Sequence, residues 1–204
     1  MSAARFQILK RENQEAPASL PDEHVLVAKA QQGDTAAFKQ LYEHYKDRVY
    51  NIIIYSLKER HSAEDVLQTV FVKAYAALPF FRQESNFLTW IYRVALNECK
   101  NRRRRKRIFV PLGESADAWN RSDVATLPDE QHAREQMQQK VREAVLTLRP
   151  KLRTVVVLRY VEDLSYEEIA AILGSTPGTV ASRLHRALAA LESKLKRSNQ
   201  IETR

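Results

Sequence analysis

The fold class follows from residues 164–190, which read LSYEEIAAILGSTPGTVASRLHRALAA. A capping box at Ser165 starts a short apolar helix, and Gly174 supplies the turn that ends it. Thr176 is a favoured N-cap, and Pro177 is favoured at the first position of the helix that follows. A short helix, a tight turn and a second helix in this order predict a helix-turn-helix.

The second helix of this stretch separates apolar from polar side chains. Its apolar stripe consists of Val180, Leu184, Ala187, Leu191 and Leu195. The spacing of 3.6 residues per turn places four polar side chains in one arc on the opposite side, namely Thr179, Ser182, Arg183 and Arg186. Such an arc can enter a DNA major groove. An ordinary helical hairpin with a solvated basic face has the same pattern.

The rest of the chain also predicts helices. It has four glycines among 204 residues, and no Asn-Gly or Asp-Gly pair marks a β-hairpin. Helical periodicity runs over residues 22–32, from an N-cap at Asp34, from a capping box at Ser62 to a break at Pro79, and from about Ser85. One further helix ends before Pro150, and other helices follow it. We therefore expect an all-α fold of two small helical domains.

Residues 108–128 predict a flexible linker, because periodicity stops, glycine and proline appear, and the charge turns acidic. The expected organisation is an N-terminal extension at 1–21, a four-helix domain at 22–107, the linker, a helix-turn-helix domain at 129–197 and a tail at 198–204.

The charge points to a polyanionic partner. The net charge is +8, and most of the excess lies in one expected helix, where residues 85–110 hold eight Lys and Arg against Glu98 alone. We call residues 102–107, which are six consecutive Arg and Lys, the basic run. Such a run is typically a solvated helix end. Aromatic residues just before it favour single-stranded nucleic acid, because bases stack on rings while phosphates follow the charge. We expect Phe87 and Trp90 to pack inward and Phe81 to be exposed.

Several classes of protein are excluded. No apolar stretch approaches the roughly 20 residues of a membrane helix, and the first twenty residues lack the apolar segment of a secretory signal. A single cysteine, Cys99, forms no internal disulfide, and no Cys/His cluster has the spacing of metal ligands. We expect a cytoplasmic protein without metal, cofactor or membrane insertion.

Four phrases identify a resemblance. Residues 63–71 read AEDVLQTVF, 87–95 read FLTWIYRVA, 164–170 read LSYEEIA, and 178–184 read GTVASRL. In this order the chain resembles bacterial RNA polymerase sigma factors of the extracytoplasmic-function (ECF) group, within the sigma-70 family, over about residues 22–196. The resemblance implies a sigma-2 domain at 22–107, a sigma-4 domain at 129–197, and promoter-specific initiation without enzymatic chemistry.

The resemblance also implies partners and site residues. The partners are core RNA polymerase through its beta-prime clamp and beta flap, promoter DNA and an anti-sigma factor. The clamp would meet Asp65, Val66, Gln68 and Phe71. The minus-ten element would meet Phe81, Arg82, Ser85, Asn86, Phe87, Arg93, Asn97, Lys100, Asn101 and Arg102. The minus-thirty-five element would meet Thr179, Ser182, Arg183, His185 and Arg186.

One departure and two alternatives remain. Ala181 stands where the family often has Arg or Lys, and alanine can contact a thymine methyl but cannot bind guanine. A stand-alone helix-turn-helix regulator would explain residues 165–195 but not the phrase at 63–71. A nuclease would need clustered carboxylates or a histidine pair, whereas the five histidines are scattered.

Overall fold

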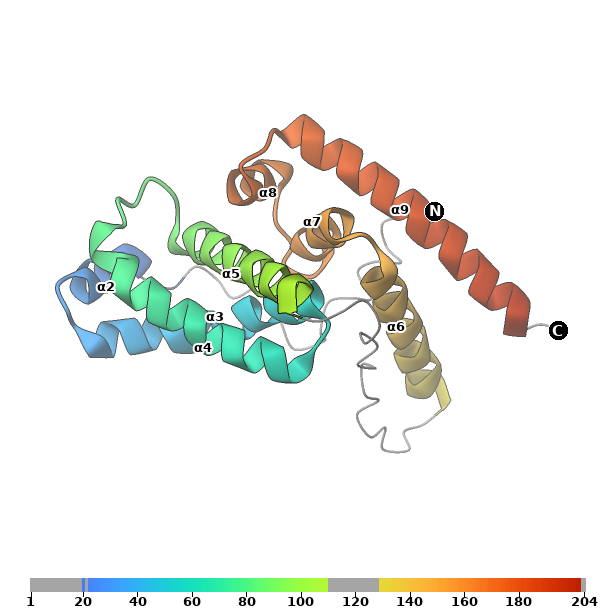
Figure 1. Ribbon diagram of the computed structural model, residues 1–204, viewed down its shortest axis with the longest axis horizontal. Helices are drawn as coiled ribbons and strands as arrows, with labels where there is room; N and C mark the ends of the chain where they lie inside the picture. The colour runs from blue at the N-terminus through green and yellow to red at the C-terminus, as the bar shows by residue number, and fades with distance from the viewer. Residues whose placement is uncertain (1–19, 21, 110–128, 203–204) are drawn as a thin grey trace. The chain divides into compact units, whose positions relative to one another are not determined.

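The structure, a computed structural model, describes residues 20, 22–109 and 129–202, with side chains described for 20, 22–106 and 137–196. The described part contains helices and no strand, which confirms the predicted all-α class (Figure 1). The helices are α2 (Glu23–Gln31), α3 (Thr35–Leu57), α4 (Arg60–Ala77), the 3₁₀ helix η1 (Leu78–Phe80), α5 (Phe87–Phe109), α6 (Asp129–Thr147), α7 (Pro150–Tyr160), α8 (Tyr166–Leu173) and α9 (Pro177–Glu202).

Local capping signals set several helix ends. Asp34 begins α3 by accepting from the amides of Ala36 and Ala37 at 2.8 and 3.0 Å. The predicted capping box of α8 is present, with Ser165 and Glu168 each bonding the other's backbone N–H. Gly33, after α2, has φ +92°, a value that favours glycine. The predicted caps at Asp34 and Ser165 are confirmed, because a cap depends only on residues close in sequence.

The predicted start of α4 was wrong. The helix begins at Arg60, and Ser62 lies inside its first turn, where its hydroxyl donates to the Glu59 carboxylate at 2.9 Å. The first intrahelical bond runs from the amide of Ala63 to the carbonyl of Glu59 at 3.0 Å. Extended backbone at Glu59 therefore sets the start, and Ser62 caps nothing.

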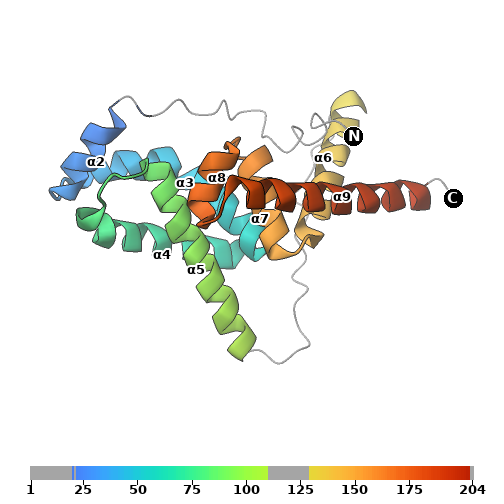
Figure 2. The same cartoon turned by 90° about the horizontal axis from the view of Figure 1, so that it is seen from above.

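The contacts divide the chain into two units, the first containing α2 to α5 and the second containing α6, α7, α9 and the first part of α8. In the first unit α3 packs against α2, α4 and α5. Its core includes Leu41, Val49, Ile52, Ile53, Val70, Ile91, Tyr92 and Ala95, all at most 1% exposed. The C-terminal turns of α5 extend beyond the other helices of the unit (Figure 2).

In the second unit α9 packs against α6 and α7. Arg153 of α7 is buried, and its guanidinium donates to the carbonyls of Leu146 and Leu148 at 2.8 and 3.4 Å, at the C-terminal end of α6. A buried cation needs such partners, so Arg153 fixes the corner between α6 and α7. Within the described residues, no helix is long and apolar enough to cross a membrane. The predicted linker lies outside the described residues, apart from 108 and 109, which belong to α5.

His44 of α3 makes stability depend on pH. Burial, reinforced by the charge of Arg48 and partly opposed by Glu23, lowers the pKa of His44 below 6.5. The unfolded chain then binds a proton that the folded chain does not, so the free energy of unfolding falls as pH drops through about 6.5 toward the folded pKa. We expect the free energy of unfolding, measured with urea, to fall more in the wild type than in His44→Gln when the pH is lowered from about 7.5 to about 5.5. Equal losses in the two proteins would contradict this origin.

Candidate functional site

An aromatic cluster supports the start of α5. The ring of Phe81 stacks on Trp90 at 4.8 Å between centroids, and Phe87 lies 5.5 Å from Trp90 and 5.3 Å from Tyr45. Phe87 is 1% exposed, as expected, and Trp90 is half-buried. The cluster therefore forms a rigid base under the loop that precedes α5.

The expectation that Phe81 is exposed was wrong. Its side chain is 9% exposed, whereas that of Phe80 is 83% exposed. The short 3₁₀ helix η1 turns the chain so that Phe81 joins Trp90 and Phe87, and the ring before it faces outward. A ligand at this site would meet Phe80, one of the aromatic residues that precede the basic run, and Phe81 would support it from below.

Residues 82–86, which we call the recognition loop, lead into α5. Arg82 and Asn86 are exposed and Ser85 is half-buried. The predicted start of α5 near Ser85 is two residues early, because Asn86 is the N-cap, its side-chain oxygen accepting from the amide of Thr89 at 2.8 Å. Three of the predicted minus-ten residues thus lie together on an accessible loop beside the aromatic cluster.

Two residues of α2, which are far from the loop in sequence, form hydrogen bonds to the loop and to the residues on either side of it. The Gln31 amide donates to the carbonyls of Leu78 and Phe81 at 3.1 and 2.7 Å, and it accepts from Gln83 at 3.3 Å. The Glu23 carboxylate accepts from the amide of Phe87 at 3.2 Å and from the hydroxyl of Tyr45. The sequence gives no sign of either role, because the partners lie 22 to 64 positions away and no local motif marks the two residues.

Glu23→Ala is expected to destabilise the first unit by about 1–3 kcal/mol, because it leaves a mostly buried tyrosine hydroxyl and a helix N-terminal amide without their acceptor. Glu43→Ala is the matched control, since Glu43 is exposed and pairs with Lys46 within the same helix. Chemical unfolding compares the two variants. Equal stabilities would show that Glu23 anchors nothing.

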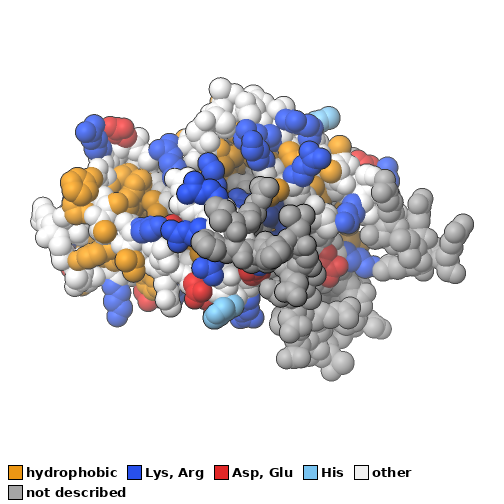
Figure 3. Space-filling view, viewed as in Figure 1, with side chains coloured by type: hydrophobic (Ala, Val, Ile, Leu, Met, Phe, Trp, Pro, Cys, Tyr) orange, Lys and Arg blue, Asp and Glu red, His pale blue; other side chains and the backbone are white. Residues whose placement is uncertain are grey.

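The polar face of α5 continues from the recognition loop. Arg93, Asn97 and Lys100 are exposed and Asn101 is half-buried. On the opposite side Ile91, Ala95 and Cys99 are completely buried, and burial raises the pKa of the Cys99 thiol to about 12. The helix therefore presents one polar face to solvent, as its periodicity predicted. In Figure 3 Lys and Arg side chains gather where α5 runs.

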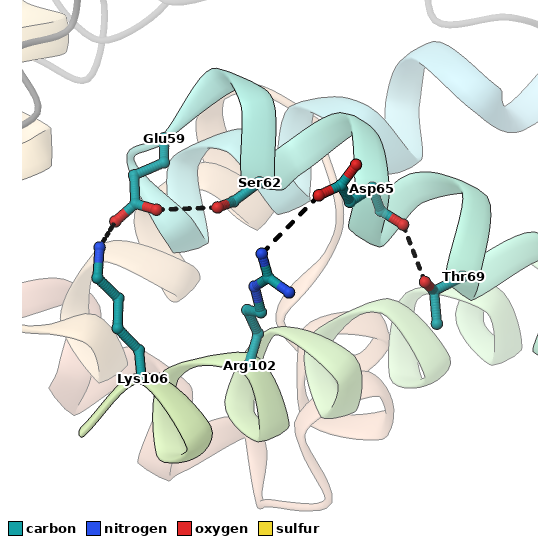
Figure 4. Close-up of polar contacts among 6 residues, drawn as sticks. All are labelled: Glu59, Ser62, Asp65, Thr69, Arg102 and Lys106. Carbon is teal, nitrogen blue, oxygen red and sulfur yellow. Dashed lines mark hydrogen bonds and ion pairs between the residues drawn. The ribbon is translucent and has the colours of Figure 1, made fainter. Parts of the chain in front are cut away.

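The basic run is partly neutralised by one carboxylate of α4 and by another at the residue just before it. Arg102 pairs with Asp65 at 3.8 Å, and Lys106 pairs with Glu59 (Figure 4). Burial alone would raise the pKa of Glu59, but hydrogen bonds from Lys106 and Ser62 and the charges of Lys106 and Arg102 lower it. Arg104 and Arg105 are exposed, and the side chain of Arg107 lies outside the described residues. Cations of the run are thus not equally available to a phosphate backbone.

The predicted polymerase-binding residues of α4 divide between its surface and its core. Asp65 and Gln68 are exposed, but Val66 and Phe71 are 3% and 4% exposed and belong to the unit's own core. Phe71 packs edge-on against two aromatic rings of α3. The structure thus places Asp65 and Gln68 of the predicted polymerase-binding residues on the surface, and Val66 and Phe71 in the core of the unit.

Two other apolar side chains of α4 lie on its exposed side. Val72 is 69% exposed and Tyr75 is 40% exposed. Together with Asp65 and Gln68 they recur at positions i, i+3, i+7 and i+10, which is one side of a helix. We call these four residues the α4 face. The helical spacing in the sequence could have indicated the α4 face, because Val66 and Val70 mark the inward side of the helix.

The polar arc of α9 is accessible as predicted. The N-cap is Thr176, which accepts from the amide of Thr179 at 3.2 Å. Ser182, His185 and Arg186 are exposed, and Thr179 and Arg183 are half-buried. The opposite stripe of Val180, Leu184, Ala187 and Leu191 is at most 1% exposed. The arc therefore lies on the solvent side of its own unit, beside the turn at Gly174.

Family models match both units. A model described as Sigma-70 region 2 matches residues 41–108, and one described as Sigma-70, region 4 matches residues 138–191. The chain is 35% identical to the RNA polymerase sigma-H factor of Pseudomonas aeruginosa over 178 residues, 83% of this chain and 92% of that protein. It is 34% identical to the ECF RNA polymerase sigma-E factor of Escherichia coli K12, over 85% of this chain and 94% of that protein.

A solved structure has a similar fold. It is the sigma factor RpoE in complex with the anti-sigma factor NepR from Bartonella quintana, with a TM-score of 0.64 and 26% identity. The match covers 78% of this chain and 96% of that one.

Proposed function

The chain belongs to the ECF group of the sigma-70 family, and on that premise we propose which surfaces carry out its work as an alternative sigma factor. The α4 face docks on the beta-prime clamp of core RNA polymerase. The recognition loop and α5 bind the minus-ten element, and α9 reads the minus-thirty-five element. One observation carries this proposal: the chain has two separate polar faces suited to DNA, on α5 and on α9, and a third, partly apolar face on α4. DNA binding does not require the third face.

Docking on the α4 face combines apolar and polar contacts. Val72 and Tyr75 supply exposed apolar area, whose burial contributes about 25 cal/mol per Å². Asp65 and Gln68 add charge and hydrogen bonding beside it, which fixes orientation more than affinity. Val66 and Phe71 keep these side chains in place from the core.

Minus-ten binding uses the recognition loop and the polar face of α5. A base pulled out of the stack costs a few kcal/mol, which a protein pocket must replace. Arg82, Ser85 and Asn86 would contact such a base at the rim, with Phe81 and Phe87 supporting the loop from below. Arg93, Asn97, Lys100 and Asn101 would follow the strand along α5, with Arg102 at its end.

Minus-thirty-five binding uses the arc of α9. Ser182, His185 and Arg186 are exposed and would reach base edges in the major groove, while Thr179 and Arg183 would meet phosphates or the groove wall. No step in this function makes or breaks a covalent bond. The chain would act as a non-enzymatic subunit in the cytoplasm.

An anti-sigma factor is the further partner that we propose. One similar solved structure is described as a sigma factor in complex with an anti-sigma factor. Exposed apolar side chains on α4 suit a protein partner that competes with polymerase for the same face.

The test is transcription in vitro from a promoter library, with core polymerase alone and with the chain added. The proposal predicts new start sites that require both components. It fails if no promoter yields initiation that depends on the chain. A stand-alone regulator would instead bind specific DNA without core enzyme and change initiation by another sigma factor.

A further inference from the structure

We propose that Phe80 is a stacking platform for an unpaired base of the promoter strand next to the recognition loop. The inference rests on the proposed function and adds a contact to it. Among the large hydrophobic side chains that the structure describes as exposed, that of Phe80 has the greatest exposed fraction, 83%. Hydrophobic side chains gather over the end of the first unit that carries α2 and the recognition loop (Figure 3).

The position of Phe80 is fixed by its surroundings. Pro79 stands in the first turn of η1, the amide of Phe81 donates to the carbonyl of Leu78 at 3.0 Å, and Gln31 donates to the carbonyls of Leu78 and Phe81. Phe81, the residue after Phe80, stacks on Trp90. The ring therefore faces solvent because rigid backbone directs it there. Backbone that is fixed in advance loses less entropy when the side chain it carries binds a ligand.

The neighbouring residues favour a nucleobase as the occupant. Arg82 is exposed two positions later, so a cation able to meet a phosphate follows a flat ring that offers no hydrogen bond. An aromatic ring beside a cation is the combination used to bind single strands, and stacking tolerates every base because each has a π face. The recognition loop continues directly from this ring toward α5, along the path that we propose for the strand.

Stacking would add affinity for melted DNA without adding base specificity. A fully paired promoter has its bases stacked on one another, so Phe80 would have no base to bind. The residue would therefore favour the open complex over the closed one.

The experiment compares Phe80→Leu, Phe80→Trp and wild type in holoenzyme assembled from the full chain and core polymerase. Leucine keeps an apolar side chain but removes the ring, and tryptophan keeps a stacking surface. Each holoenzyme is titrated, at a low temperature at which the paired promoter stays closed, with a promoter fragment that is fully paired and with the same fragment carrying an unpaired minus-ten stretch. Val25→Leu is the control, because Val25 is also exposed, at 49%, and has no assigned role.

We expect Phe80→Leu to bind the unpaired fragment roughly tenfold more weakly than wild type, Phe80→Trp to bind it normally, and all variants to bind the paired fragment alike. Three results would overturn the proposal: Phe80→Leu binding like wild type, an equal loss on both fragments, or reduced affinity for core polymerase instead. If the wild-type chain itself supports no promoter binding by core enzyme, the proposed function fails too. Normal wild-type binding with an indifferent Phe80 overturns this inference alone.

Discussion

Val72→Glu is expected to weaken binding to core RNA polymerase by about 100-fold or more, because it places an unpaired carboxylate in an interface that buries apolar surface. Val72 is 69% exposed, so the substitution should leave the folded unit intact. Binding is measured with labelled chain and purified core enzyme, and thermal unfolding confirms the fold.

The matched control for this prediction is Val25→Glu. Val25 is exposed on α2, outside the α4 face, so the added charge should not affect docking. Val66→Ala gives a further contrast, because Val66 is buried and its truncation should lower stability first. Unchanged affinity in Val72→Glu would remove the α4 face from the polymerase interface, and an equal loss in Val25→Glu would indicate a general effect of charge.

Replacing the whole basic run by glutamine should lower affinity for every promoter alike and flatten the dependence of binding on salt. Removing the cation that binds one phosphate reduces the slope of log K against log salt by roughly 0.9 for duplex DNA and roughly 0.7 for single strands. The full variant is therefore expected to lose a slope of several units. Fluorescence titrations of holoenzyme over a series of salt concentrations measure it.

The ion pairs to α4 sharpen this expectation. Arg102 and Lys106 already have carboxylate partners in the free chain, so the pair substituted together should change the slope less than Arg104 and Arg105 substituted together. Weaker binding at one promoter class with others unaffected would contradict a phosphate role, since phosphates carry no sequence. Equal slopes for the two double variants would show that the ion pairs open at no cost when DNA binds.

Features that depend on neighbouring residues could be predicted from the sequence. The caps at Asp34 and Ser165 are present because each needs partners within three positions. The periodicity of α9 placed Val180 and Leu184 inward, which left Ser182 and Arg186 exposed. The exposed polar face of α9 therefore followed from the local pattern.

Features that depend on tertiary packing could not be predicted in this way. Two consecutive phenylalanines, Phe80 and Phe81, have the same local preference, and only the 3₁₀ turn and the Trp90 ring decide which is buried. Glu23 and Gln31 act on partners far along the chain. Phe71 was expected at the polymerase interface from the family resemblance alone, which carries no information about burial. The structure places Phe71 in the core.

The most direct test of two separate DNA-binding modules in one sigma factor is a footprint of the holoenzyme on a selected promoter. Wild type should protect two regions, near minus-ten and near minus-thirty-five. Substituting Asn97 and Asn101 should remove the first alone, and substituting Ser182 and Arg186 should remove the second alone. A single protected region that disappears as a whole in either variant, or protection by the chain without core polymerase, would contradict the division of labour between α5 and α9.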